Sequence, residues 1–125
     1  MASTLGDSSC SLAWGGKLAG VADADLAAGV LSGRGEGLSA SERVLANWAR
    51  RVTRDPAATT ATDIDELRAA GYDDRQVLAI TLFVGLRIAF STVNGALGSR
   101  PDRQLADSAP AEVRDVVTYG RPVDE

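Results

Sequence analysis

The sequence predicts an all-α protein in which residues 1–125 form a single helical domain of five or six helices. Alanine is abundant, and no stretch alternates apolar and polar residues as a half-buried strand would. Helix starts recur along the chain as Ser or Asp followed three residues later by Glu or Gln. One long segment, residues 77–97, is apolar on nearly all sides. A chain of 125 residues can bury a normal core without disulfides or metals.

The first two predicted helices are short. The first covers about residues 9–19 and is interrupted by Gly15 and Gly16. Asp23 is the expected N-cap of the second, which ends at Leu31. The glycine-rich stretch 32–37 follows as a flexible loop. We do not read it as a phosphate-binding loop, because no strand precedes it and no Gly-Lys-Ser/Thr follows it.

The next two helices have clearer boundaries. Ser39 and Glu42 form a capping box, in which each side chain bonds the other residue's backbone amide. One apolar stripe follows, made of Val44, Leu45, Trp48 and Val52. The dipeptide 55–56, Asp-Pro, ends this helix. A short helix then begins at Thr62 and ends at Gly71, with Ile64 and Leu67 facing inward.

The longest predicted helix begins at Asp73, with Gln76 completing a capping box and Tyr72 placed to pack on Val77. It ends before Gly98 and Pro101. Because it is apolar on nearly all sides, we expect it to be the buried centre of a bundle or the core of an oligomer. One narrow polar stripe is formed by Arg87, Ser91, Asn94 and Gly98, and a face of small residues by Thr81, Gly85 and Thr92. Residues from about 100 to 125 read as a polar tail with a short helix near 112–117.

Two residue counts limit the possible chemistry. The chain has no histidine, and Cys10 is its only cysteine. These counts exclude a Cys/His zinc site, a catalytic Ser–His or Cys–His pair, a haem histidine and an intramolecular disulfide. We therefore expect no metal and no cofactor.

The net charge and the hydropathy of the chain limit the kinds of partner that we expect it to bind and the compartment in which we expect it. The net charge is -4, and the thirteen basic residues are scattered, so we expect no nucleic-acid partner. No targeting signal is recognisable at residues 1–10. The longest apolar run, residues 77–90, is too short to span a bilayer and contains Arg87. We expect a cytoplasmic protein that does not contact membranes.

Cys10 and Arg87 are the residues that could support chemistry. Cys10 follows Ser8 and Ser9, either of which could cap the first helix, and a thiol in a first turn feels the positive end of the helix dipole. Its pKa would then be lowered, which favours a reactive thiolate; the alternative is a small buried apolar residue. Arg87 inside an apolar helix needs a partner, either a substrate carboxylate or, as we favour, a structural Asp or Glu. Trp14 and Trp48 are expected to be packing residues.

Three stretches resemble the alkylhydroperoxidase D-like, carboxymuconolactone decarboxylase family, and specifically its peroxidase-related branch. They are CSLAWGGKLA at residues 10–19, SERVLANWARRVTRDPAATTATDIDELRAAGYDDRQV at 41–77, and TYGRPV at 118–123. Together they cover most of the chain. The resemblance implies an all-α alkylhydroperoxidase D-like bundle whose protomers assemble as a homotrimer or larger oligomer.

The family's redox members use a C-x-x-C pair, a histidine four residues after the second cysteine, and an upstream glutamate. The resemblance places Cys10 at the second, peroxide-attacking cysteine. Asp7 stands where the first cysteine belongs, and Trp14, which cannot relay a proton, where the histidine belongs. The glutamate has no counterpart in this sequence.

Three functions follow as hypotheses. The first is thiol-dependent reduction of a hydroperoxide by Cys10, with an external thiol resolving the product. The second is a non-redox decarboxylase, lyase or isomerase that holds an organic acid in an intersubunit pocket, with Arg87 on the carboxylate. This hypothesis predicts a helix-lined cavity with an arginine that has no carboxylate partner. The third is a non-catalytic oligomeric relative that associates through the Thr81–Gly85–Thr92 face or the first helix.

Overall fold

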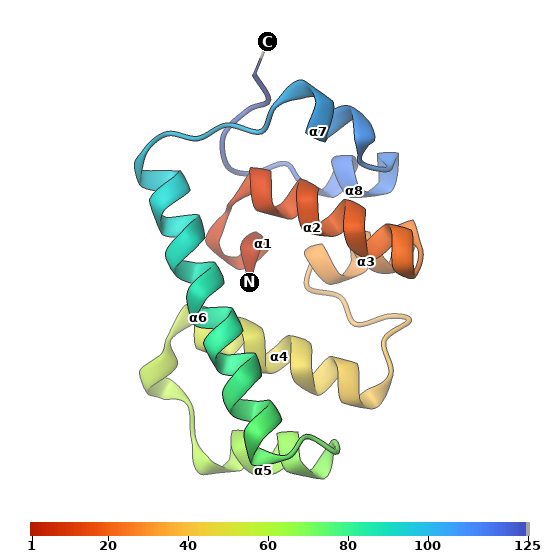
Figure 1. Cartoon of the computed structure of the whole chain (residues 1–125). Helices are drawn as coiled ribbons and strands as arrows, with labels where there is room; N and C mark the ends of the chain where they lie inside the picture. Colours follow the sequence, from red (N-terminus) through yellow and green to blue (C-terminus); the bar gives the residue numbers. More distant parts are fainter. Residues whose placement is uncertain (125) are drawn as a thin grey trace.

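The computed structural model describes residues 1–124, and these contain α-helices, one short 3-10 helix and no strand (Figure 1). The all-α prediction is confirmed, with eight α-helices in place of five or six. They are α1 (Ala2–Leu5), α2 (Ser8–Val21), α3 (Ala24–Leu31), α4 (Ala40–Arg54), α5 (Ala61–Ala69), α6 (Asp74–Ala96), α7 (Arg103–Ser108) and α8 (Ala111–Val116), with η1 (Pro56–Ala58) between α4 and α5.

Most helix starts lie where the capping signals predicted them. Asp23 accepts a hydrogen bond from the backbone amide of Leu26 at 2.7 Å, and the capping box of Ser39 and Glu42 is complete. Two predicted caps are wrong. Asp7, rather than Ser8 or Ser9, caps α2, and α5 begins after Thr60 instead of at Thr62. The Asp7 side chain accepts from the amide of Cys10, and at α5 the Asp63 carboxylate accepts from the amide and the hydroxyl of Thr60, so polar contacts upstream of the expected caps fix both helix starts.

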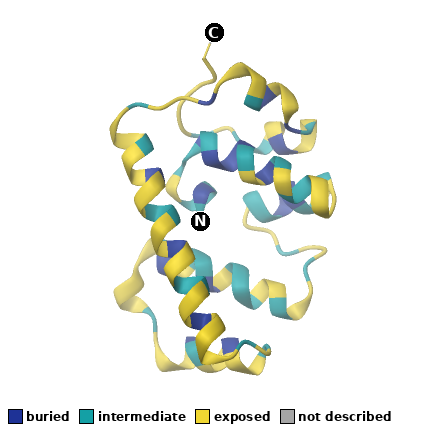
Figure 2. Ribbon diagram, in the orientation of Figure 1, coloured by how far each residue is buried: buried dark blue, intermediate teal, exposed yellow. Residues whose placement is uncertain are grey.

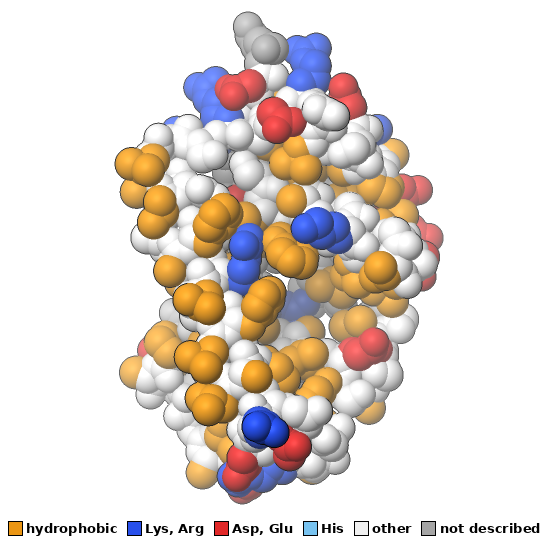
Figure 3. Space-filling view, viewed as in Figure 1, with side chains coloured by type: hydrophobic (Ala, Val, Ile, Leu, Met, Phe, Trp, Pro, Cys, Tyr) orange, Lys and Arg blue, Asp and Glu red, His pale blue; other side chains and the backbone are white. Residues whose placement is uncertain are grey.

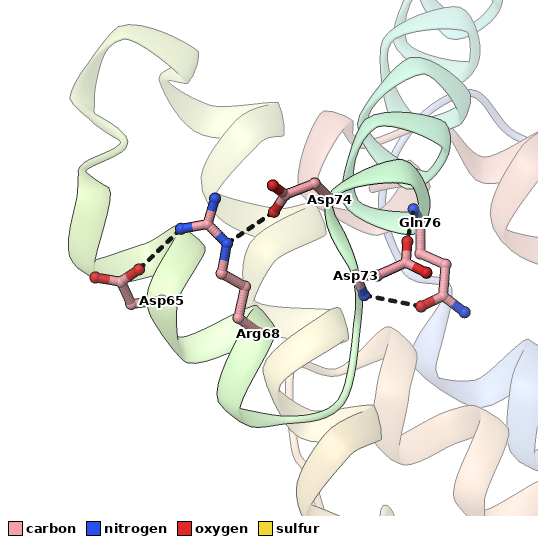
Figure 4. Close-up of polar contacts among 5 residues, drawn as sticks. All are labelled: Asp65, Arg68, Asp73, Asp74 and Gln76. Carbon is pink, nitrogen blue, oxygen red and sulfur yellow. Dashed lines mark hydrogen bonds and ion pairs between the residues drawn. The ribbon is translucent and has the colours of Figure 1, made fainter.

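The junction between α5 and α6 shows how local polar contacts fix a tight turn (Figure 4). Asp73 accepts from the amide of Gln76 at 2.8 Å, and the Gln76 side chain accepts from the amide of Asp73 at 2.9 Å. Arg68 in α5 donates to Asp74 at the start of α6 at 2.7 Å, and to Asp65 at 3.0 Å. These contacts orient α6 as it leaves the turn.

The core consists of two separate hydrophobic clusters. The upper cluster in Figure 1 joins α2, α3, α7 and α8 through Leu12, Ala27, Ala106, Ala109 and Val113. The lower cluster joins α4, α5 and α6 through Trp48, Val52, Leu67, Val77 and Val84. The short helix α1 packs against α2, α4 and α6, so it contacts both halves.

The expected polar tail is wrong for residues 101–117. Pro101, Ala106, Ala109 and Val113 are all buried, and the last three belong to the upper cluster. The predicted helix near 112–117 exists as α8, but α7 was not predicted. A six-residue helix gives too short a periodic pattern to be recognised, and the one buried residue of α7 is an alanine.

The expectation that α6 is buried on nearly all sides is also wrong for the single chain. Only Val77, Val84 and Ser91 of α6 are buried, and most of the helix surface is exposed (Figure 2). The helix is 23 residues long, as its predicted ends imply, and an 18-residue stretch of it has a mean hydropathy of 1.8, so by length and composition it could cross a bilayer, which the run 77–90 alone did not indicate. Its buried side is held in the bundle by α4 and α1.

Candidate functional site

A cavity of about 260 Å³ lies between the two hydrophobic clusters. Its wall is built by α1, α2, α3, α4 and α6, and most of it is apolar, with contributions from Trp14, Leu18, Leu31, Ala49 and Phe83. Two guanidinium groups, those of Arg50 and Arg87, also line it. The cavity therefore combines an apolar body with cationic groups, which suits a small ligand that is itself apolar with one anionic end.

Arg87 has no ion pair with any carboxylate among residues 1–124, so the favoured structural ion pair is wrong. Its guanidinium carbon lies 4.6 Å from the ring centre of Phe90 and 5.2 Å from that of Trp14. One terminal nitrogen donates to the Cys10 sulfur at 3.1 Å, while the buried Nε has no hydrogen-bond partner among the described residues. Stacking on aromatic rings holds the charge in place without neutralising it.

Arg50 is the second cationic group of the cavity, and it comes from the opposite wall, on α4. It is half-buried and donates to the carbonyl of Val30 at 3.0 Å and to the amide oxygen of Asn47 at 3.4 Å. Burial and then the charge of Arg54 lower the pKa of Arg50. Within residues 1–124 no carboxylate pairs with it, so its positive charge is desolvated without a counter-ion.

Cys10 is buried, at 4% exposure, and its sulfur contacts the guanidinium group of Arg87, which lines the cavity. Its backbone amide donates to Asp7 at 2.8 Å, and a buried oxygen of the Asp7 carboxylate has no partner among the described residues. The same is true of the buried Ser91 hydroxyl. Three unpartnered polar atoms therefore lie around the thiol, from Asp7, Arg87 and Ser91.

The pKa of the Cys10 thiol is raised, which is opposite to the direction expected from its place in a first turn. Burial is the largest cause, and the Asp7 carboxylate adds to it, while Ser91 and Arg87 act in the lowering direction. Asp7, the N-cap of α2, thus also places a negative charge beside the sulfur. The thiol, not the thiolate, is the favoured form.

Trp14, expected to be a packing residue, lies one helical turn after Cys10 and is 41% exposed, so only part of its ring packs within the fold. Its ring packs edge-on against Phe83, with 6.3 Å between centres, and Lys17 lies 4.4 Å above it. Trp14, Phe83 and Arg87 together form one wall of the cavity. Trp48, by contrast, is a packing residue as predicted, at 6% exposure, and its indole donates to Thr81 at 3.0 Å.

The structure brings together all four residues singled out from the sequence: Asp7, Cys10, Trp14 and Arg87. Sequence reasoning missed Arg50, because it lies on the polar side of a well-patterned amphipathic helix. It also missed the role of Ser91, although Ser91 belongs to the predicted polar stripe of α6. Residues 1–124 contain no group of three metal-ligating side chains.

Comparison with protein-family models, with curated proteins and with solved structures finds no significant match to this chain. The resemblance to alkylhydroperoxidase D-like proteins therefore stays a prediction from the residues.

Proposed function

We propose that this chain binds a small organic acid in the cavity between its two hydrophobic clusters. The observation that carries the proposal is that Arg50 and Arg87 line an otherwise apolar cavity while neither has a carboxylate partner in residues 1–124. A carboxylate can accept charge-assisted hydrogen bonds from such groups, and an apolar tail fits the remaining wall. This corresponds to the non-redox hypothesis from the sequence, with the pocket inside one chain instead of between subunits.

The size of the cavity limits the ligand. A volume of about 260 Å³ is just below the usual range of roughly 300–1,000 Å³ for ligand pockets, so a short-chain or single-ring carboxylate fits best. Decarboxylation, isomerisation or lyase chemistry would be a further step at this pocket. The hydroxyl of Ser3, which lines the cavity, and the thiol of Cys10, which contacts Arg87, are the nucleophiles that such a step could use.

Hexanoate and its neutral analogue 1-hexanol test the proposal by calorimetric titration. We expect hexanoate to bind more tightly than hexanol, because only the acid can use the guanidinium groups. Arg87→Gln and Arg50→Gln should each weaken hexanoate binding about 10-fold, as expected for a lost charge-assisted hydrogen bond, and leave hexanol unaffected. Arg87→Lys should lie in between, because lysine keeps the charge but loses the planar fork.

Arg75→Gln is the matched control, because Arg75 is an exposed arginine at the start of the same helix, α6. It should leave both affinities unchanged. Equal binding of hexanoate and hexanol, or an Arg87→Gln variant that binds hexanoate like the wild type, would show that the cavity is not a carboxylate site.

Peroxide reduction by Cys10 is the second candidate, and the Arg87–sulfur contact of 3.1 Å favours it. In this reaction the thiolate sulfur attacks one peroxide oxygen and the O–O bond breaks. The sulfur is oxidised to a sulfenic acid, and the alcohol or water leaves with the second oxygen. An external thiol then condenses with the sulfenic acid to a mixed disulfide and releases water, and a second external thiol attacks this disulfide, which regenerates Cys10 and leaves the two external thiols as a disulfide.

The raised pKa of Cys10 opposes this candidate, and Asp7 offers a direct test of it. Asp7→Asn keeps a capping side chain but removes the negative charge, so the thiol pKa should fall and alkylation by iodoacetamide should become several-fold faster. Asp23→Asn, at the equivalent cap of α3, is the control and should not change the rate. If Cys10→Ser consumes peroxide as fast as the wild type, the peroxidase candidate is excluded.

A further inference from the structure

Helix α6 presents a long apolar face that none of residues 1–124 covers. Seven large apolar side chains on α6 and at its C-terminal end are at least half exposed: Leu78, Leu82, Phe83, Leu86, Phe90, Val93 and Leu97, at 50–82%. Figure 3 shows hydrophobic side chains following the length of α6 on the face in view. The only charged side chain between residues 78 and 97 is Arg87, and it is turned toward α2. The face is about 30 Å long.

The exposed apolar residues of α6 have the spacing along the sequence that is typical of a helix packed against another helix. Six exposed positions are spaced four and three residues apart in strict alternation: Ala79, Phe83, Leu86, Phe90, Val93 and Leu97. This 3.5-residue repeat is the seam of a helix pair. A parallel row beside it contains small residues, Gly85, Ala89, Thr92 and Ala96, all exposed. Large side chains of one helix can therefore pack over small ones of an identical helix.

The area of the face matches what a stable dimer needs. Given their exposed fractions, the seven large side chains together expose on the order of 800 Å². This exceeds the largest apolar patch of a typical monomer, roughly 300–600 Å². It equals the roughly 800 Å² that each partner buries in a standard protein interface.

We propose that α6 packs antiparallel against α6 of a second copy of this chain, around a two-fold axis near residue 88. In this arrangement Phe83 faces Val93 of the second copy, and Leu86 faces Phe90. The antiparallel direction brings Asp73 toward Arg103 of the other copy, and neither of these residues has an ion pair among residues 1–124. A parallel pair would place Asp73 beside Asp73, so charge favours the antiparallel arrangement.

The pairing also affects the cavity that we propose to bind an organic acid. Ala79 and Phe83 belong both to the seam and to the lining of a second hollow of about 460 Å³, which shares Phe83, Arg87 and Ala49 with the first cavity. A second copy on α6 covers the outer rim of this hollow. Hexanoate should therefore bind more weakly to a monomeric variant, an expectation that rests on the proposed function.

The mass of the full chain in solution tests the pairing, measured by light scattering and sedimentation over a range of concentrations. We expect twice the 13.0 kDa chain mass for the wild type. Leu86→Lys with Val93→Lys should raise the dimer dissociation constant about 100-fold or more, because two buried apolar contacts are replaced by charges. Since both positions are exposed in the single chain, the helical circular dichroism spectrum should stay unchanged.

Val21→Lys is the control, because Val21 is 86% exposed at the end of α2, away from the α6 face. It should remain dimeric. A monomeric wild type at the highest soluble concentration, or a dimer unchanged by Leu86→Lys with Val93→Lys, would overturn the proposal. A monomer that sediments with phosphatidylcholine–phosphatidylglycerol vesicles would also overturn it, and would assign the face to a lipid surface.

Disulfide trapping tests the direction of the pairing in a Cys10→Ser background. A mixture of Ala79→Cys and Leu97→Cys chains should form a covalent dimer on oxidation, whereas each variant alone should not. Dimers from each variant alone would indicate a parallel pair and overturn the antiparallel arrangement. A dimer that does not bind hexanoate would leave this inference standing and count only against the proposed function.

Discussion

The upper and lower clusters are built from different side chains, although both are cores formed by packed helices. Three of the five buried residues of the upper cluster are alanine, whereas the lower cluster contains Trp48 and no alanine. Small side chains allow the upper helices to approach closely. At Gly15 of α2, an added Cβ would lie 2.8 Å from atoms of both Leu31 and Val113. The upper core therefore relies on close helix contact, and the lower core on side-chain volume.

The cavity lies where these two kinds of packing meet. Helix α6 belongs to the lower cluster at its beginning, but near Arg87 its partners become α1 and the side chains of α2. Side chains at the edge of each cluster, Leu18 and Leu31 of the upper one and Ala49 of the lower one, line this region together with aromatic and cationic groups. A binding site at the boundary thus follows from two cores that do not merge.

The largest effect should come from removing volume in the lower core. Leu67 is fully buried, so Leu67→Ala should lower the free energy of unfolding by about 2–5 kcal/mol. Val113→Ala, at an equally buried position of the upper core, removes fewer atoms and should cost about 2 kcal/mol. Urea unfolding followed by circular dichroism measures both. If Val113→Ala lost more unfolding free energy than Leu67→Ala, the upper core and not the lower one would depend more on side-chain volume.

Adding volume should affect the upper core most. Gly15→Ala places a methyl group against Leu31 and Val113, and overpacking of this kind costs about 1–3 kcal/mol. Gly16→Ala is the matched control, because its nearest neighbour lies at 4.0 Å and the change gains helix propensity, up to about 1 kcal/mol. Thermal melts should therefore move in opposite directions. Equal shifts of the two melts would mean that α2 does not approach its neighbours this closely.

A polar contact inside the lower core should have a smaller effect. Thr81→Val leaves the indole N–H of Trp48 without its acceptor in a buried position, which costs about 1–3 kcal/mol. Thr53 is the control, because its hydroxyl donates to the carbonyl of Ala49 one turn back, as that of Thr81 does to the carbonyl of Val77, but accepts no hydrogen bond among the described residues. Thr53→Val should stay within about 0.5 kcal/mol of the wild type in urea unfolding. If both variants behave alike, the Trp48–Thr81 bond contributes little.

The smallest expected effect is a pH dependence of the lower half. The backbone amide of Thr60, and then its hydroxyl and Arg51, lower the pKa of Asp63. Because the folded-state pKa is lowered, the carboxylate stabilises the fold above the ordinary aspartate pKa, and this contribution is lost as the pH falls through the folded-state value. Asp63→Asn should therefore show a shallower loss of thermal stability in acid. Asp25→Asn, at an exposed site of α3, should keep the wild-type slope.

The sequence alone predicted the helices that begin with a strong capping signal. Asp23, Ser39 with Glu42, and Asp73 with Gln76 all cap helices as expected, because capping involves groups only three residues apart. The sequence also selected Asp7, Cys10, Trp14 and Arg87, which do lie together. It could not give the thiol's pKa, because that depends on burial and on which residue caps α2.

Local residue patterns therefore determined the helical class and most helix boundaries of this protein. Only the tertiary structure decided which side of α6 is buried, that Arg87 stacks on aromatic rings instead of pairing with a carboxylate, and that Arg50 faces the same cavity from another helix. The physical reason is distance along the chain. Caps and helical stripes are interactions between near neighbours, whereas burial and charge pairing at a site depend on residues tens of positions apart that only the packed fold brings together.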